Sequence, residues 1–271
     1  MEEQLRLFPA KADPRPPISV TWNGWHGCDP VSQGCKHCYM MRRDREYGID
    51  PRTVHKTSSF RLPIQKYSVG EHKGLYKIPS GSTIFTCFTS DFFHATADEW
   101  RDEAWAMIRE RSDCNFFMVT KRPERIKDHL PEDWEETRYN NVQVSCTCEN
   151  QYWTDRRLPI FLSLPLPHKS ITHEPMQDRI NIRKYLKEYG SEIESVSCGG
   201  ESGLGSTGLR FCVDPGYAHA VRRLWDSLLL PPDRIEAQER RKNIRNSPGA
   251  STQAGSQGTS GFRRGASSRL G

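Results

Sequence analysis

The sequence has no hydrophobic run long enough to cross a membrane. A membrane-spanning helix needs about 20 consecutive, mostly apolar residues, and hydrophobic residues make up only 35% of this 271-residue chain. The start of the chain, Met1-Glu-Glu-Gln, also lacks the basic and then apolar pattern of a secretory signal. We therefore expect a cytoplasmic protein without a membrane partner.

A disulfide framework is not expected either. The nine cysteines are an odd number and are unevenly spaced. In a chain without an export signal, this pattern favours reduced thiols and metal ligation. Six cysteines lie in or beside apolar, strand-like runs, where we interpret them as small buried hydrophobic residues: Cys87, Cys114, Cys146, Cys148, Cys198 and Cys212.

The main part of the chain has little net charge. Residues 233–271 contain eight Lys and Arg against three Asp and Glu, an excess of five that equals the net charge of the whole chain, +5. Residues 1–232 are therefore balanced, and they show no basic patch typical of a nucleic-acid surface.

Three cysteines are placed where they could share one metal centre. Cys28, Cys35 and Cys38 follow the spacing C-x6-C-x2-C, and a C-x2-C pair in a tight turn can direct both sulfurs at one metal. Three thiolates would leave one iron of an iron–sulfur cluster open to a ligand. Zinc, with His26 or His37 as fourth ligand, and unligated cysteines are the alternatives.

The rest of the sequence predicts alternating strands and helices. We expect strands at residues 18–22, 83–89, 115–120, 141–147, 169–172 and 193–197, and helices at 39–47, 97–111 and 217–230. A long polar connection occupies residues 48–80. Strands that alternate with helices indicate parallel βαβ units, and right-handed crossovers would close them into a partial or full (β/α) barrel.

Polar side chains follow each predicted strand, and ligands gather at the carboxyl ends of parallel strands. The candidates are Asp91, Lys121, Glu149, Glu174, Gly199, Gly200 and Glu201. Asp91, Glu149 and Glu174 could instead be helix N-caps. Lys121, with Arg122 and Arg125, could hold a carboxylate or phosphate. The Gly-Gly-Glu run lets backbone amides approach a ligand and offers a carboxylate to an ammonium group.

The run at residues 22–39 resembles a phage-associated family of unknown function that carries a radical S-adenosylmethionine (radical SAM) type of three-cysteine motif. The resemblance covers residues 18–225, through residues 89–93, 120–125, 148–151, 173–175 and 199–203. It implies that Cys28, Cys35 and Cys38 ligate a [4Fe-4S] cluster and that S-adenosylmethionine is the second cofactor. Tyr39 would pack near its adenine. An electron donor such as flavodoxin or ferredoxin and a nucleotide or nucleic-acid substrate would be the partners.

Composition, together with the extent of the resemblance, divides the chain into three parts. Residues 1–17 are an extended, proline-rich leader, 18–230 the radical-SAM-like barrel domain and 231–271 a basic tail whose composition predicts disorder. The abrupt change in composition suggests a frame-shifted end, so that the last strands are missing; a genuine basic arm for nucleic acid is the alternative.

Two functions follow from these observations. One is a radical SAM enzyme acting on an unknown substrate. The other is a non-catalytic zinc or iron–sulfur module for nucleic-acid or protein contact. The widened first spacing of the cysteine motif favours the module, and the series of polar strand ends favours the enzyme.

Overall fold

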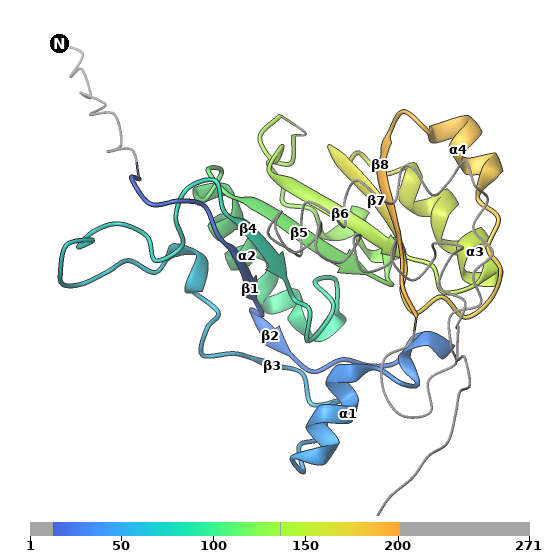
Figure 1. Cartoon of the computed structure of the whole chain (residues 1–271), viewed down its shortest axis with the longest axis horizontal. Helices are drawn as coiled ribbons and strands as arrows, with labels where there is room; N and C mark the ends of the chain where they lie inside the picture. The colour runs from blue at the N-terminus through green and yellow to red at the C-terminus, as the bar shows by residue number, and fades with distance from the viewer. Residues whose placement is uncertain (1–12, 136, 201–271) are drawn as a thin grey trace, which may run out of the picture. The chain divides into compact units, whose positions relative to one another are not determined.

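The computed structural model describes residues 13–135 and 137–200 (Figure 1). The predicted helix at 217–230 and the basic tail at 231–271 lie outside the described residues. So do Glu201, Cys212 and most of the predicted leader. Everything below concerns the described part of the chain.

Six parallel strands form the main sheet. They lie side by side in the order β1-β4-β5-β6-β7-β8, and every neighbouring pair is parallel (Figure 1). Their bounds are β1 Ser19–Trp22, β4 Thr83–Thr86, β5 Asn115–Thr120, β6 Val142–Thr147, β7 His168–His173 and β8 Ile193–Cys198. The six predicted strands are therefore confirmed, and so is their parallel arrangement. Since β1 and β8 are the edges within residues 13–135 and 137–200, closure into a barrel stays a prediction.

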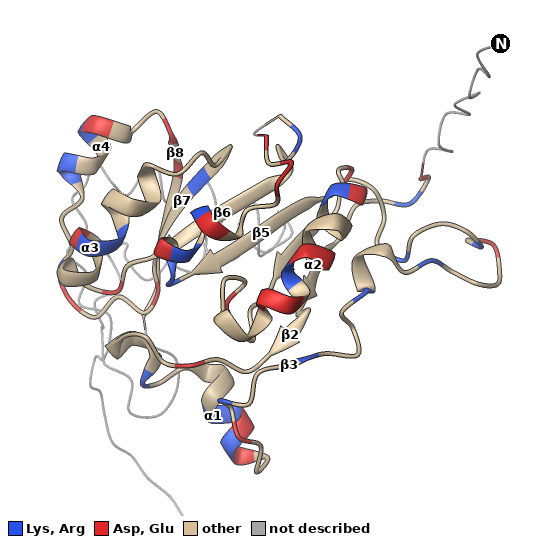
Figure 2. Ribbon diagram, turned by 180° about the vertical axis from the view of Figure 1, so that it is seen from behind, with Lys and Arg blue, Asp and Glu red and all other residues tan. Residues whose placement is uncertain are grey.

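Helices alternate with the strands along the chain. The α-helices are α1 Tyr39–Glu46, α2 Asp98–Glu110, α3 Gln151–Leu162 and α4 Arg183–Tyr189, and the 3-10 helices are η1 Gln33–Cys35, η2 Leu62–Ile64, η3 Ala95–Ala97, η4 Pro123–Arg125 and η5 Lys127–His129. Of these, α2, α3 and α4 contribute side chains to the hydrophobic core. Ala104, Met107 and Ile108 of α2 are buried, while its outer side carries charged residues (Figure 2). None of the helices in the described residues is long and apolar enough to span a membrane.

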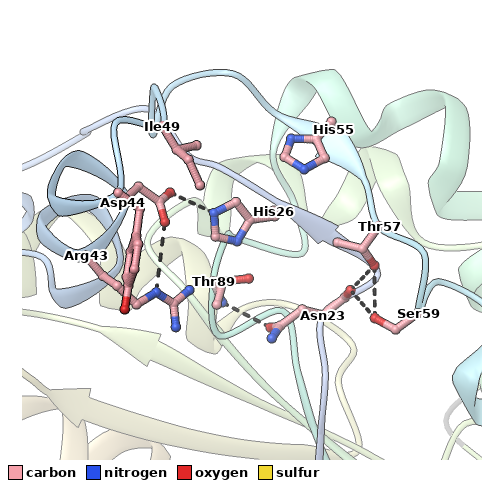
Figure 3. Close-up of a pocket in the computed structure, with 10 residues that line it drawn as sticks. Asn23, His26, Arg43, Asp44, Ile49, His55, Thr57, Ser59 and Thr89 are labelled. Atoms are coloured by element: carbon pink, nitrogen blue, oxygen red, sulfur yellow. Dashed lines mark hydrogen bonds and ion pairs between the residues drawn. The ribbon is translucent and has the colours of Figure 1, made fainter.

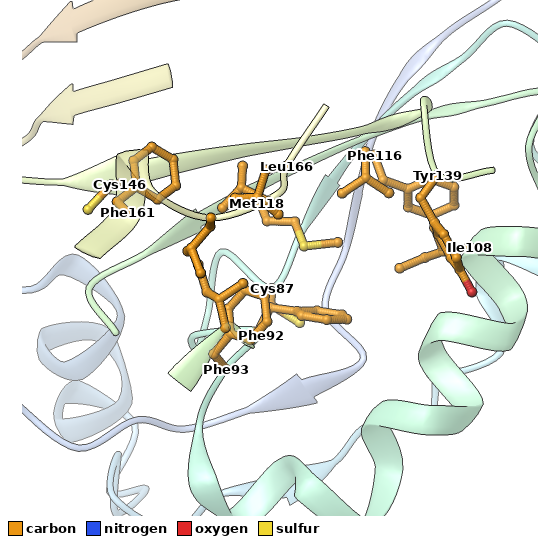
Figure 4. Packing of buried hydrophobic residues seen from close by; sticks show 14 of the residues in the cluster. Cys87, Phe92, Phe93, Ile108, Phe116, Met118, Tyr139, Cys146, Phe161 and Leu166 are labelled. Carbon is orange, nitrogen blue, oxygen red and sulfur yellow. The ribbon is translucent and has the colours of Figure 1, made fainter. Parts of the chain in front are cut away.

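Alternate side chains of the strands build the core. Phe116 and Met118 of β5 are fully buried, and they share one hydrophobic cluster with Ile108 of α2 and Phe161 of α3 (Figure 4). Trp22 of β1 meets the ring of Phe116 edge-on at 6.0 Å between centroids. Successive side chains of a strand point to opposite faces of the sheet, so burying one set of them in this cluster fixes the orientation of each strand. That orientation determines which polar side chains lie at the carboxyl end of the strand.

The connection at residues 48–80 is more structured than predicted. It contains β3 His55–Lys56, which pairs antiparallel with β2 Trp25–His26 in a separate two-stranded sheet. Thr57 extends this contact because its backbone N–H donates to the carbonyl of Gly24 at 3.0 Å. These strands have only two residues each, too few for a periodicity to reveal them.

Candidate metal and cofactor site at the strand ends

The three cysteines of the motif lie in the loop that joins β2 to α1. All three are half-buried and none forms a disulfide bond. Backbone hydrogen bonds from Cys35 N–H to the Ser32 carbonyl (3.0 Å) and from Cys38 N–H to the Cys35 carbonyl (3.2 Å) give the C-x2-C segment its predicted turn. Helix α1 begins directly after Cys38, so the helix anchors one end of the loop.

Arg122 faces the first cysteine. Its two terminal nitrogens lie 3.7 and 3.8 Å from Cys28 Sγ, and one of them also donates to the carbonyl of Asp29 at 2.9 Å. Burial raises the pKa of the Cys28 thiol to about 11, although the guanidinium opposes this rise. The cation alone therefore does not make this thiol a thiolate at neutral pH, whereas a bound metal would.

Lys121 faces the second cysteine. Its ammonium nitrogen lies 3.8 Å from Cys35 Sγ. Burial raises the pKa of the Cys35 thiol, but the charge of Lys121 and hydrogen bonds at Val31 and Ser32 outweigh it, so the pKa lies below its ordinary value. Cys35 is therefore easier to ionise than Cys28.

The sulfur atoms do not yet form a ligand set. Within the described residues, no group of three His, Cys, Asp or Glu side chains is arranged to hold a metal ion. The Nε2 of His26 is hydrogen-bonded to Asp44 at 2.7 Å, and the zinc alternative with His26 or His37 as fourth ligand stays a prediction. The donor chemistry of three thiols on one loop still suits an iron–sulfur cluster.

Asp91 holds the residues at the end of β5 that face the cysteine loop. It follows β4, is only 4% exposed, and accepts hydrogen bonds from Thr120 Oγ1 at 2.8 Å and from the Lys121 backbone N–H at 3.0 Å. The same carboxylate forms an ion pair with Arg122 at 3.0 Å. Its oxygens thus bind the end of β5 and hold Arg122 against Cys28. The cofactor contact predicted for Asp91 stays a prediction.

Glu149 holds the cation that faces the second cysteine, as Asp91 does for the first. It is fully buried, pairs with Lys121 at 2.7 Å and with Arg157 of α3 at 2.7 Å, and accepts a hydrogen bond from Ser32. Burial raises the pKa of this carboxyl, but the two cations outweigh burial and lower it. The N-cap alternative is wrong for Glu149, because Asn150 caps α3 by accepting the Trp153 N–H at 3.0 Å.

Glu174 is different from these two carboxylates. It follows β7, is half-buried, and makes no hydrogen bond or ion pair with any described residue. Burial raises the pKa of its carboxyl. A Cβ on Gly199 would lie 2.7 Å from Glu174 Cγ, so the glycine leaves room for this side chain. The backbone N–H of Gly199 donates to His173 at 3.0 Å, which brings the ends of β7 and β8 together.

Two further candidates lie at the margins of this region. Tyr39, the first residue of α1, is 48% exposed, and its hydroxyl donates to the carbonyl of Phe88. The hydrogen bond joins the cysteine loop to the segment after β4. Gly200 is half-buried directly after Gly199.

Sequence reasoning missed Ser32 and Arg157. Ser32 lies between the cysteines and contacts both Glu149 and Cys35, the latter at 3.7 Å. Arg157 lies inside α3 and stacks over the ring of Trp153 at 4.1 Å from its centroid. A buried glutamate requires a cation, but nothing in the sequence shows which arginine supplies it.

The comparisons with known proteins agree with the extent of this fold. A search of curated proteins and a search of solved structures each found no match. A family model described as "Protein of unknown function (DUF5131)" matches residues 18–223, which include the cysteine loop and all six strands of the main sheet. The chain therefore belongs to the DUF5131 family.

Proposed function

We propose that the cysteine loop binds a [4Fe-4S] cluster and that the protein is a radical SAM enzyme. The observation that carries this proposal is the pairing of thiols with cations at the carboxyl edge of a parallel sheet: Arg122 lies 3.7 Å from Cys28 Sγ and Lys121 lies 3.8 Å from Cys35 Sγ. Ligands of parallel α/β folds gather at this edge.

Cys28, Cys35 and Cys38 would hold three irons, which leaves the fourth iron open. When bound, such a cluster supplies the electron that cleaves the sulfonium bond of S-adenosylmethionine to give a carbon radical. The proposed substrate is a nucleotide or nucleic-acid base, and the electron donor is a flavodoxin or a ferredoxin.

The chain's own residues prepare the thiols for ligation. Lys121 and Arg122 offset the negative charge of the thiolates, and Glu149 and Asp91 hold these two cations in place. Because Asp91 and Glu149 are both nearly inaccessible to solvent, the role that this proposal gives them is to position the two cations.

Glu174, Gly199 and Gly200 are the groups that we assign to the amino-acid part of S-adenosylmethionine. Glu174 has a half-buried carboxylate without a partner among the described residues, and an ammonium group would supply one. Gly199 leaves room for the Glu174 side chain, because a Cβ at residue 199 would clash with it. Tyr39 offers a half-exposed ring for contact with adenine.

Anaerobic purification with iron and sulfide quantification tests the proposal directly. We expect about four irons per chain, an electron-paramagnetic signal after reduction with dithionite, and 5′-deoxyadenosine when S-adenosylmethionine is added. Cys35→Ala should remove all three results. Cys114→Ala is the matched control and should keep the cluster. Cys114 is buried directly before β5, so it lies at the amino end of that strand, whereas the proposed site lies at the carboxyl ends.

Two outcomes would contradict the enzyme. Zinc in place of iron would support the metal-binding module, and so would a cluster that leaves S-adenosylmethionine intact. A cluster that survives in Cys35→Ala would contradict the ligand assignment.

The assignment of Glu174 needs a separate measurement. Glu174→Gln should keep the iron content but raise the KM for S-adenosylmethionine by about tenfold, since a charge-assisted hydrogen bond to an ammonium is lost. Asp178→Asn, an exposed carboxylate in the same segment after β7, should change neither quantity. An unchanged KM in Glu174→Gln would contradict the assignment.

A further inference from the structure

A polar pocket lies between α1, the two-stranded sheet and the loop after β4 (Figure 3). Its volume is about 400 Å³. Its described lining contains none of the residues assigned above to the cysteine site. The pocket is therefore separate from the cysteine site.

A carboxylate and a histidine form its inner wall. Asp44 of α1 is 2% exposed, and its Oδ2 lies 2.7 Å from the Nε2 of His26. Because the carboxylate accepts a hydrogen bond there, Nε2 carries a proton and Nδ1 is left for another partner. Arg43 lies 4.0 Å from the other oxygen of Asp44. One buried negative charge thus supports two basic groups.

A second histidine and several neutral donors complete the wall. The ring of His55 lies 5.6 Å from that of His26, and its Nδ1 is hydrogen-bonded to the carbonyl of Thr53 at 3.0 Å, which leaves Nε2 for a ligand. Asn23 accepts the Thr89 N–H through Oδ1 at 3.1 Å, so its NH₂ group remains a donor. The hydroxyl of Thr89 is buried and has no partner among the described residues.

The carbonyl groups at the C-terminal end of α1 are not free to repel an anion in this pocket. Carbonyl groups in the last turn of a helix carry partial negative charge, but here they are used within the chain. The N–H groups of Gly48 and Ile49 donate to the carbonyls of Arg45 (3.1 Å) and Asp44 (2.8 Å), which is the Schellman arrangement. The groups left for a ligand are therefore basic side chains and neutral hydrogen-bond donors.

We propose that this pocket binds a phosphate-bearing small molecule. Arg43 would contact the phosphate as a guanidinium, which forms charge-assisted hydrogen bonds with its oxygens, and His26 and His55 would donate to it in their doubly protonated form. Tyr47 is 76% exposed and Ile49 is 49% exposed at the rim. Both offer apolar surface to the organic part of the ligand. The proposal does not depend on the cofactor of the cysteine loop.

Isothermal titration of the full chain with inorganic phosphate, AMP and adenosine tests the proposal. We expect phosphate and AMP to bind at one site and adenosine to bind much more weakly. Arg43→Gln and His55→Gln should each raise the Kd for AMP by about tenfold. Both side chains are exposed, so the melting temperature should not change. Arg45→Gln is the matched control, because Arg45 is an exposed cation on the same helix outside the pocket.

Three outcomes would overturn the proposal: no binding of phosphate or AMP, equal binding of adenosine and AMP, or an equal loss of affinity in Arg45→Gln. Cys35→Ala should bind AMP as the natural chain does. Its behaviour separates this proposal from the one for the cysteine loop, because either can fail while the other stands.

Discussion

Gly34 and Glu149 pack so closely that a Cβ on Gly34 would lie 2.5 Å from the Glu149 Cγ and 2.8 Å from its Oε1. Gly34 directly precedes Cys35, and Glu149 is the buried carboxylate that pairs with Lys121 and Arg157. The cysteine loop therefore packs directly against the Glu149 side chain. Any side chain at residue 34 would have to displace either the loop or Glu149.

Gly34→Ala should lower the free energy of unfolding by about 1–3 kcal/mol, the usual cost of overpacking a buried position. Urea denaturation would measure it. Gln33→Ala is the control, because Gln33 is exposed in the same turn and its loss should cost little. Equal stability of Gly34→Ala and the natural chain would mean that the loop does not rest on Glu149.

Glu149→Gln should lower the free energy of unfolding by about 3 kcal/mol, because it leaves the buried charge of Arg157 and the half-buried charge of Lys121 without a counter-ion. Glu103→Gln provides the comparison. Glu103 also pairs with two cations, Lys56 and Arg61, but at the surface, so its loss should cost less than about 1 kcal/mol. Similar values from urea denaturation for both variants would contradict this prediction.

In the metal-free protein, iodoacetamide should modify Cys35 faster than Cys28. The thiolate is the reactive form, and the pKa of Cys35 is lowered while that of Cys28 is raised to about 11. Mass spectrometry of peptides after timed alkylation would give both rates. Lys121→Gln should slow the modification of Cys35.

Lys36→Gln is the control for the alkylation experiment, since Lys36 is an exposed neighbour of Cys35. Equal rates for the two cysteines, or the same effect from both lysine variants, would show that Lys121 does not set the reactivity.

Asp98 should contribute to stability only above acidic pH. Partial burial raises the pKa of this carboxyl, but hydrogen bonds from Arg101, Arg125 and His129 outweigh it and lower the pKa to about 2. In the unfolded chain the pKa is about 3.9. The stabilisation is therefore fully present above about pH 5 and is lost as the pH falls toward 2.

Urea denaturation between pH 6 and pH 2.5 would test this prediction with Asp98→Asn. The variant should be less stable at pH 6 by less than about 1 kcal/mol, because the side chain is 45% exposed and solvent screens its charge. The difference should shrink as the pH falls. Asp102→Asn, an exposed carboxylate on the same helix, should show no such trend, and a constant difference for Asp98→Asn would contradict the assignment.

The apolar and β-branched runs in the sequence predicted where the strands lie, but not always where they end. Residues 115–120 were predicted as a strand and form β5 with the same bounds. The strand predicted at 83–89 ends at Thr86 instead, because Cys87 has a φ of 59° and turns the chain away from the sheet. Cys87 is apolar and lies in an apolar run, so its conformation has no signal in the sequence. The prediction of burial is confirmed for Cys87, Cys114, Cys146 and Cys148, whereas Cys198 at the end of β8 is only half-buried.

The sequence by itself determined the parallel α/β architecture and the grouping of three thiols on one loop, because periodicity and spacing are local properties of a chain. Only the tertiary structure decided which partners the polar strand ends take. Asp91 and Glu149 turn toward Arg122, Lys121 and Arg157, whereas Glu174 meets no described cation. The physical reason is that a buried carboxylate is stable only beside a counter-charge, and the counter-charge comes from whichever element the fold brings near.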